Sequence, residues 1–354
     1  MSGKRHFLRL HRTLWLILFA ALVPPQSASA TEMPAALTIH RDIPWAEVNG
    51  RALTSDIFTP LENAPEPRPV VVIYHGGGWL INSNRIMDSA ARYIASHGDF
   101  VVANMNYRLL GDNANSTNMD DIVEDALGGL LWVKENIARY GGDPSRIAVT
   151  GDSAGGHLSA MVLLAARNLS SAGFSPESLA FTPTYLPGGK TPEDIAEHDA
   201  LAVQAAVLSY GAFDLYSAAL EGFESPDNFF WQMGGAKARG MFGAEYNAQQ
   251  NPELYKAVSP VYLVPKATEY KLPPVFAHVG SKDTTTPPQA VEQFVDKLRS
   301  AGQDVEYKVY PGKNHAFLES GCNEYLGNCF DEDAPAALDD MIQFIQRVLT
   351  GRDS

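Results

Sequence analysis

The sequence is poor in cysteine and in basic residues, and each shortage narrows the classes of protein to which it can belong. Only 2 of its 354 residues are cysteine, which excludes a small fold held together by a dense disulfide framework. Lys and Arg together number 27 against 41 Asp and Glu, so the formal net charge is −14. A surface with that excess of acid repels phosphate backbones and anionic lipid headgroups, which argues against nucleic acid as a partner.

Charged residues are also scarce, at 19%, whereas 45% of the residues are hydrophobic. A chain of that composition can bury a large core, so intrinsic disorder and collagen-like repeats are excluded. The length fits one large α/β domain with insertions as well as two domains, and the order of the motifs has to decide between them.

The first 30 residues carry four basic side chains and no acid, and they are predicted to be a secretory signal peptide cleaved after about Ala30. An apolar run at residues 14–23 follows the positive charges, and the small residues Ala28 and Ala30 frame a cleavage site. This run of ten residues is too short for a helix that spans a bilayer, which takes about 20; an uncleaved anchor is the alternative. We therefore expect a secreted or periplasmic protein with no stable membrane anchor after removal of the leader.

The two cysteines, Cys322 and Cys329, lie close together near the end of the chain. In an oxidising compartment this spacing favours a small local disulfide. Two free thiols are the alternative. A zinc site is weaker still, because no paired His or Cys ligands lie nearby.

Short, continuous apolar runs recur along residues 31–354, as in strands that are buried on both faces of a parallel sheet. They lie at residues 70–74, 100–105, 146–150, 203–209, 275–279 and 305–310. Helical patterns lie between most of them, and an amphipathic one ends the chain; their ranges are about 85–97, 119–139, 154–168, 287–301 and 335–349. This alternation predicts a doubly wound, mostly parallel α/β sheet in a single domain.

Three segments depart from this alternation. Residues 38–58 alternate apolar and polar side chains around Asn49-Gly50, which predicts an N-terminal antiparallel hairpin. Residues 170–200 are rich in Ser, Pro, Gly and acids, and residues 211–260 hold many aromatic side chains among glycines. We interpret both as insertions, the second as a lid or pocket wall; the alternative is that its aromatics pack a satellite core.

The strongest chemical signal is Gly151-Asp152-Ser153-Ala154-Gly155, which follows the strand at 146–150 and precedes a helix. Gly-x-Ser-x-Gly in this context places a serine on a sharp turn above the carboxyl edge of the sheet. The helix N-terminus behind the serine favours negative charge. Ser153 is therefore the predicted nucleophile.

A neutral serine needs a base, and the base needs an orienting partner. Among the histidines after the leader, His315 fits best, because it lies in a loop between the last strand and the terminal helix. His157 is the competitor: it lies one helical turn after Ser153 but is expected to point along the helix.

Asp283 is the predicted acid, because it follows the strand at 275–279 and falls between the serine and the histidine in chain order, as in α/β hydrolases. Asp214 also follows a strand and is the competitor. If it is not the acid, it is structural or lines the leaving-group side of the site, and we name it as a predicted substrate contact.

A glycine run, His75-Gly76-Gly77-Gly78-Trp79, follows the strand at 70–74 directly. A tetrahedral intermediate carries an oxyanion that needs two or three N–H donors, and consecutive glycines let backbone amides turn inward. We predict that the N–H groups of Gly77, Gly78 and Ala154 form this oxyanion hole, and that Trp79 contacts the substrate. Neither glycine cluster continues into the Gly-Lys-Ser/Thr of a phosphate loop, and no metal site is expected.

At these motifs the sequence resembles α/β-hydrolase esterases with an HGGG oxyanion motif. Two branches match: hormone-sensitive-lipase-like carboxylesterases and bacterial feruloyl/acetyl-xylan esterase-like proteins. The resemblance covers nearly the whole chain after the leader, with matching stretches at 75–79, 106–109, 140–144, 151–157, 280–283 and 312–317. After Tyr107-Arg108-Leu109 the first branch usually continues Ala-Pro-Glu, whereas this chain has Leu110-Gly111-Asp112, which favours the second branch.

The resemblance implies hydrolysis of a small carboxylic ester, such as an aryl, acetyl or feruloyl ester, through an acyl-enzyme and without a cofactor. Two other functions share the motifs. One is amide cleavage or acyl transfer, as in kynurenine-formamidase-like enzymes, and the other is a non-catalytic binding protein with a hydrolase fold. The sequence does not indicate an oligomeric state.

Overall fold

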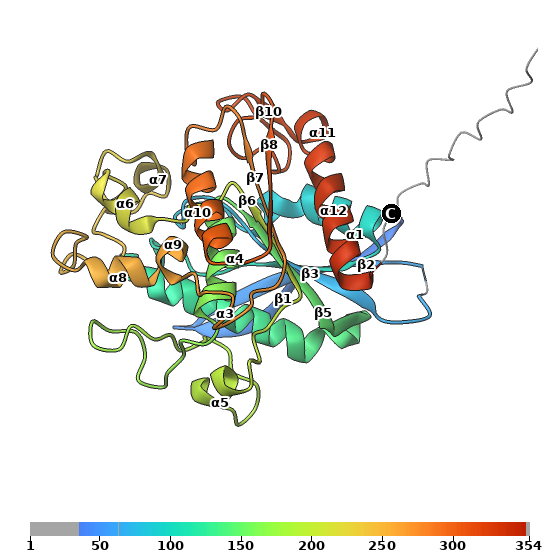
Figure 1. Cartoon of the computed structure of the whole chain (residues 1–354), viewed down its shortest axis with the longest axis horizontal. Coiled ribbons are helices and arrows are strands. Elements are labelled where there is room, and N and C mark those ends of the chain that lie inside the picture. The colour runs from blue at the N-terminus through green and yellow to red at the C-terminus, as the bar shows by residue number, and fades with distance from the viewer. Residues whose placement is uncertain (1–34, 63, 352–354) are drawn as a thin grey trace, which may run out of the picture. The chain divides into compact units, whose positions relative to one another are not determined.

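An eight-stranded sheet runs through the computed structural model, which describes residues 35–62 and 64–351 (Figure 1). The strand order is β1-β2-β4-β3-β5-β6-β7-β8. Strands β1 and β2 pair antiparallel, β2 pairs antiparallel with β4, and the remaining neighbours pair in parallel. The strands are β1 Leu37–Val48, β2 Arg51–Pro60, β3 Arg68–Tyr74, β4 Val101–Met105, β5 Gly142–Asp152, β6 Ala205–Ser209, β7 Val275–Gly280 and β8 Val305–Tyr310.

The predicted sheet is confirmed, and its hydrophobic pattern explains why. Strands β3, β4, β6 and β7 are buried along their whole length, as expected for central strands covered on both faces. The predicted hairpin is strands β1 and β2, joined by Asn49 and Gly50 at φ 51° and 77°. Asn-Gly is the pair that tolerates positive φ at both turn positions. The predicted leader lies outside the described residues.

Helices cover the sheet in two layers. Helices α1 and α12 pack against each other, and α3 and α4 pack against each other on the opposite face (Figure 1). The helices are α1 Asp88–Gly98, α2 Asp112–Asn115, α3 Met119–Asn136, α4 Ala154–Ala165, α5 Pro192–Glu197, α6 Leu215–Leu220, α7 Phe229–Met233, α8 Pro252–Ala257, α9 Pro260–Leu263, α10 Pro288–Ser300, α11 Phe330–Asp333 and α12 Pro335–Thr350, with 3-10 turns at Asn84–Met87 and Ile137–Tyr140.

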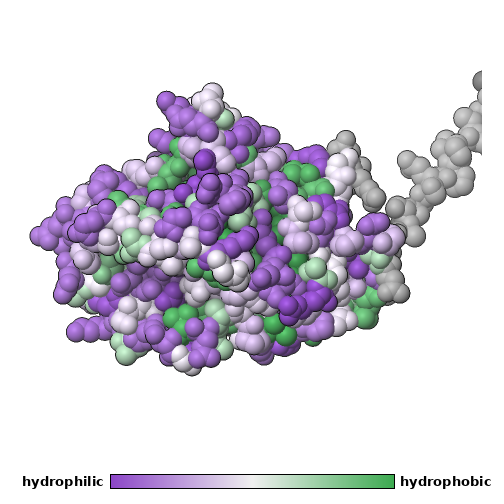
Figure 2. Space-filling model, turned by 90° about the horizontal axis from the view of Figure 1, so that it is seen from below, coloured by the Kyte–Doolittle hydropathy of each residue, from purple (hydrophilic) through white to green (hydrophobic). Residues whose placement is uncertain are grey.

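The aromatic insertion at 211–260 contains the three short helices α6 to α8, and α9 begins at its last residue. Trp231 and Tyr255 are fully buried, so part of the segment packs a core of its own, whereas Phe229 and Met233 are exposed. The packed part agrees with the satellite-core alternative, whereas a lid or pocket wall stays a prediction. The face of the molecule that Figure 2 shows is predominantly hydrophilic, with apolar groups scattered among polar ones.

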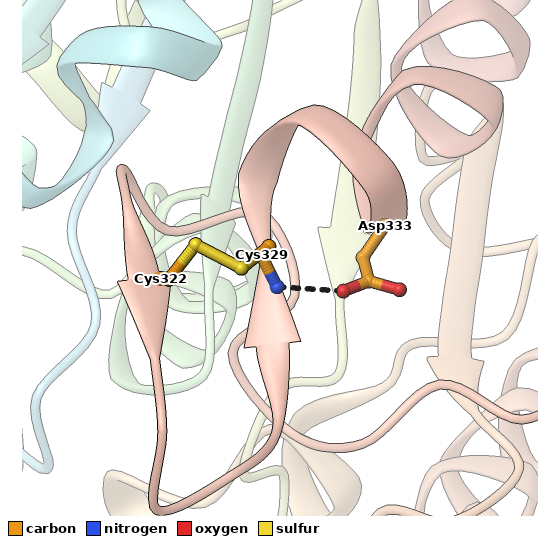
Figure 3. The surroundings of a disulfide bond; sticks show 3 residues. All are labelled: Cys322, Cys329 and Asp333. Carbon is orange, nitrogen blue, oxygen red and sulfur yellow. Dashed lines mark hydrogen bonds between the residues drawn. A yellow bond between two sulfur atoms is a disulfide. The ribbon is translucent and has the colours of Figure 1, made fainter.

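A two-stranded hairpin near the C-terminus was not among the expected strands. It pairs β9 Cys322–Asn323 with β10 Asn328–Cys329, and the predicted disulfide between Cys322 and Cys329 closes it (Figure 3). In the described part of the chain, every helix is too short or too polar to cross a membrane.

Candidate active site

The nucleophile turn joins β5 to α4 at the carboxyl edge of the sheet. Ser153 has φ 52° and ψ −114°, an uncommon backbone conformation for a residue with a side chain, and such strain gathers at functional sites. A Cβ at Gly155 would lie 1.8 Å from the carbonyl oxygen of Tyr74. Only glycine therefore lets helix α4 approach strand β3 closely enough to form this turn.

The structure brings the three predicted catalytic side chains together. His315 Nε2 lies 2.9 Å from Ser153 Oγ, and His315 Nδ1 lies 2.7 Å from Asp283 Oδ2. Ser153 and His315 are each 6% exposed, and Asp283 is 3% exposed. Nucleophile, base and acid are thus in hydrogen-bond contact and largely shielded from water, the arrangement that general-base activation of a serine requires.

The Asp283 carboxylate is oriented by the residues that follow it. Its Oδ1 accepts hydrogen bonds of 2.9 and 2.8 Å from the N–H groups of Thr285 and Thr286. The Thr286 hydroxyl donates to the carbonyl oxygen of Tyr210 and lies 3.2 Å from His315 Nδ1. Sequence reasoning missed Thr286; the signal was the Asp-Thr-Thr-Thr run, since Asp side chains readily accept from N–H groups two or three residues ahead.

The glycine loop after β3 presents the predicted oxyanion donors. Gly77 and Gly78 have φ 115° and 58°, and their N–H groups donate to no protein acceptor within residues 35–62 and 64–351. Leu80 N and Ile81 N close the turn by donating to the Gly77 carbonyl. Ala154 is the first residue of α4, where an N–H has no intrahelical partner. All three amides are therefore free to bind an oxyanion.

Two further residues hold the glycine loop. Asp152 Oδ1 accepts a 2.7 Å hydrogen bond from Gly76 N, and the Tyr107 hydroxyl donates a 2.6 Å hydrogen bond to the His75 carbonyl. Burial raises the pKa of Asp152 to about 6. Burial, and secondarily the charge of Asp152, raises the pKa of Glu319 to about 8. Sequence reasoning gave Asp152 and Tyr107 no role, although both stand inside the quoted motifs.

His157 is held away from the nucleophile. Its Nε2 lies 2.8 Å from the carbonyl oxygen of Val258 and donates to it, and its Nδ1 accepts from Trp79 Nε1 at 3.3 Å. Burial lowers the pKa of His157 to about 4, so the ring is neutral at pH 7. His157 therefore orients the buried Trp79 rather than competing with His315, and Trp79 as a substrate contact stays a prediction.

Asp214 caps helix α6 instead of facing the histidine. Its carboxylate accepts hydrogen bonds of 2.9 and 2.8 Å from the backbone N–H and the hydroxyl of Ser217. Asp283 therefore occupies the position of the acid, and a substrate contact by Asp214 stays a prediction. In the described ranges, no group of three or more His, Cys, Asp or Glu side chains could hold a metal ion.

A family model described as alpha/beta hydrolase fold matches residues 71–319, a span from the middle of β3 to just beyond His315. This chain belongs to the α/β-hydrolase fold family. The match includes all the proposed catalytic and oxyanion residues of this α/β hydrolase, in the order nucleophile, acid, base.

Curated relatives carry esterase names. This α/β hydrolase is 32% identical over 278 residues to Esterase LipQ of Mycobacterium tuberculosis, an alignment that covers 78% of this chain and 56% of the relative. It is 45% identical over 101 residues to Carboxylesterase NlhH of the same species, covering 28% of this chain and 30% of the relative. The chain thus spans about half, or less, of the length of these relatives.

A solved structure shows the same fold. The native esterase Est2 of Thermogutta terrifontis superposes with a TM-score of 0.60 at 22% identity, and the alignment covers 91% of this chain and 95% of that one. At that identity the likeness concerns the fold alone.

Proposed function

We propose that this α/β hydrolase is a serine esterase that cleaves small carboxylic esters through an acyl-enzyme. One observation carries the proposal: Ser153 Oγ, His315 and Asp283 form a continuous hydrogen-bonded chain. Beside it, the N–H groups of Gly77 and Gly78 donate to no acceptor among the described residues.

In the first half-reaction Ser153 Oγ attacks the ester carbonyl carbon while His315 Nε2 takes its proton. Asp283 accepts from His315 Nδ1 and stabilises the imidazolium that forms. The carbonyl oxygen becomes an oxyanion, to which Gly77, Gly78 and Ala154 donate. His315 then returns the proton to the leaving alcohol, and the acyl group stays on Ser153.

In the second half-reaction a water molecule takes the place of the alcohol. His315 accepts its proton as it attacks the acyl carbon, and the same amides stabilise the second oxyanion. Collapse of this intermediate releases the acid and returns the proton to Ser153. His315 carries out every proton transfer and the amides stabilise both oxyanions, so the cycle needs no cofactor.

The names of the relatives support an ester rather than an amide as substrate. Besides the two mycobacterial enzymes, the chain is 29% identical over 286 residues to an Arabidopsis thaliana protein named isoprenylcysteine alpha-carbonyl methylesterase, covering 78% of this chain and 57% of the relative. We infer that the substrate is a small acetyl, aryl or feruloyl ester.

A substrate panel tests the proposal. The purified protein is assayed on acetyl and longer aryl esters, acetylated sugars, feruloyl esters and formyl amides, with Ser153→Ala as the matched variant. We expect ester turnover that Ser153→Ala abolishes while the far-UV circular dichroism is unchanged. Turnover of formyl amides alone would favour a formamidase, and full activity in Ser153→Ala would refute the mechanism.

We also propose that the protein is exported, as a secreted or periplasmic enzyme. The basic, then apolar, then small-residue pattern of residues 1–30 supports this, and so does a disulfide in a chain with 2 cysteines. Expression of the full chain in a bacterial host, followed by N-terminal sequencing, should yield a protein that begins after about Ala30. An intact N-terminus on active protein in the cytoplasm would contradict export.

A further inference from the structure

The disulfide hairpin of β9 and β10 is hydrogen-bonded to the loop that carries His315, the proposed base. Asn328 Nδ2 donates a hydrogen bond to the backbone carbonyl of His315. Both residues are buried, at 5% and 6% exposure. A buried bond of this kind fixes the backbone of the residue whose ring must reach Ser153.

Two neighbours of His315 are tied to the same segment. Asn314 Nδ2 donates to the Leu326 carbonyl at 2.6 Å, and Lys313 Nζ lies 2.6 Å from Asp333 Oδ1. Asp333 in turn accepts a 2.7 Å hydrogen bond from the backbone N–H of Cys329 (Figure 3). Three consecutive residues of the histidine loop are therefore held by the hairpin and the turn that follows it.

The loop needs such support. Ala316, directly after His315, has φ 63°, a left-handed conformation that residues with a Cβ seldom adopt unless their surroundings hold them there. The hydrogen bond from Asn328 holds the His315 carbonyl, which belongs to the peptide unit between His315 and Ala316.

The hairpin itself depends on its covalent bond. Its ladder pairs Cys322 with Cys329 and Asn323 with Asn328, and so short a hairpin is not stable in water by its own hydrogen bonds. The Cys322–Cys329 disulfide restricts the other conformations that this segment can adopt, and so favours the hairpin.

We infer that Asn328 is a positioning residue for His315 and that the Cys322–Cys329 disulfide keeps Asn328 in place, so that turnover depends on the disulfide being formed. This inference rests on the proposed function, in which His315 takes the proton of Ser153. It implies that the enzyme reaches its full rate only where the environment is oxidising, which agrees with the proposed export.

Asn328→Asp tests the positioning residue, because it keeps the shape of the side chain but replaces the donor by an oxygen that faces a carbonyl. We expect kcat to fall by about 10- to 100-fold, since small displacements of a catalytic group carry penalties of that order, while KM changes by less than about twofold. Asn323→Asp is the matched control: it adds the same charge to the same hairpin and keeps the oxygen that accepts from Leu326 N. Equal kcat in Asn328→Asp and Asn323→Asp would overturn the inference.

Reduction of the wild-type protein tests the disulfide without any substitution. Dithiothreitol gives two electrons to the disulfide, which leaves thiols at Cys322 and Cys329 and forms the cyclic disulfide of the reductant; alkylation and mass spectrometry count the thiols. We expect kcat to fall by about 10-fold on reduction and to return on reoxidation. In Cys322→Ser/Cys329→Ser the rate should start low and not respond to dithiothreitol. An unchanged rate in the fully reduced wild type would refute the role of the disulfide.

Phosphorylation of Ser153 by paraoxon separates this inference from the proposed function. The second-order rate, followed by mass, reports activation of the serine by His315 and does not require that the protein hydrolyse esters. We expect about a 10-fold slower reaction in Asn328→Asp and in the reduced protein. A wild type that is phosphorylated but turns over no ester would defeat the esterase proposal alone, whereas equal phosphorylation rates in all forms would defeat the positioning inference.

Discussion

The Asp152 carboxylate accepts a 2.7 Å hydrogen bond from the backbone N–H of Gly76. Because Asp152 immediately precedes Ser153 and Gly76 immediately precedes Gly77, this bond joins the nucleophile turn to the oxyanion loop. A Cβ on Gly76 would lie 2.5 Å from Asp152 Oδ2, so the two segments are as close as a glycine allows. The other carboxylate oxygen, Oδ2, is buried without a hydrogen-bond partner among the described residues.

Asp152→Asn should stabilise the protein increasingly as pH rises. Burial raises the pKa of Asp152 from 3.8 to about 6 in the folded protein, so the folded state holds this proton more tightly than the unfolded state. The contribution of Asp152 to stability is therefore present at low pH and is lost as pH rises from about 4 to about 6. Asparagine keeps an acceptor for Gly76 N and does not titrate.

Urea unfolding at pH 4 and pH 7 checks this. The free energy of unfolding of Asp152→Asn, relative to wild type, should increase by about 2 kcal/mol between the two pH values. Asp152→Ala, which has no acceptor for Gly76 N, should in addition lower kcat by roughly 10-fold through displacement of the oxyanion loop. Parallel stability curves for the wild type and Asp152→Asn would contradict the raised pKa.

Asp283→Asn should lower kcat by about 10²- to 10⁴-fold, because an amide in place of the acid no longer holds the imidazole in the tautomer that accepts the serine proton. Asp214→Asn is the matched control. Asparagine caps a helix about as well as aspartate, so stability should stay close to wild type and kcat should fall by much less than in Asp283→Asn. Steady-state kinetics on an aryl ester measure both, and a larger loss in Asp214→Asn would reassign the acid.

Local patterns made the nucleophile turn and the N-terminal hairpin predictable. Gly151 to Gly155 specify a turn within five residues, and Asn49-Gly50 specify another within two. Strands buried on both faces are equally visible, because every residue of a run such as 70–74 is apolar. Chain order then placed Asp283 and His315, because loops after parallel strands meet at one edge of the sheet.

Contacts between distant segments could not be predicted in this way. Asn328 reaches His315, and Asp152 reaches Gly76, only after the sheet has assembled. The short helices of the aromatic insertion also gave no periodic signal: α7 has 5 residues and α6 has 6, less than two turns each. Their ends depend on single capping residues such as Asn228, which accepts from Phe230 N.

Gly78→Ala should lower kcat by about 10²- to 10³-fold, the range found when an oxyanion donor is removed. Gly78 has φ 58°, and a Cβ there would lie 2.6 Å from the ring of Phe230 in α7, so the loop must shift. Gly188→Ala is the matched control, because nothing lies within 4 Å of its Cβ and its φ is not positive. Steady-state kinetics on an aryl ester compare the two.

Gly78→Ala/Phe230→Ala separates the contact from the backbone conformation. Removal of the ring relieves the clash but leaves alanine at a positive φ, which costs about 1–2 kcal/mol. Partial recovery of kcat in the double variant is therefore expected. Wild-type kcat in Gly78→Ala alone would argue against the Gly78 amide as a donor.

His278→Gln should reduce the loss of stability that the protein undergoes as pH falls below 6.5. Burial lowers the pKa of His278 from 6.5 to about 3, so below pH 6.5 the unfolded state takes up a proton that the folded state does not. The contribution of His278 is therefore present above pH 6.5 and is lost as pH falls, by about 1.4 kcal/mol per pH unit. Glutamine does not titrate, and its amide can replace the contact of His278 Nε2 with the Ser209 hydroxyl at 2.9 Å.

Urea unfolding at pH 5 and pH 6.5 measures this effect. The free energy of unfolding should fall between pH 6.5 and pH 5 by about 2 kcal/mol less in His278→Gln than in wild type. His97→Gln, which removes an exposed imidazole, is the control; an equal change in both variants would show that burial of His278 is not the cause.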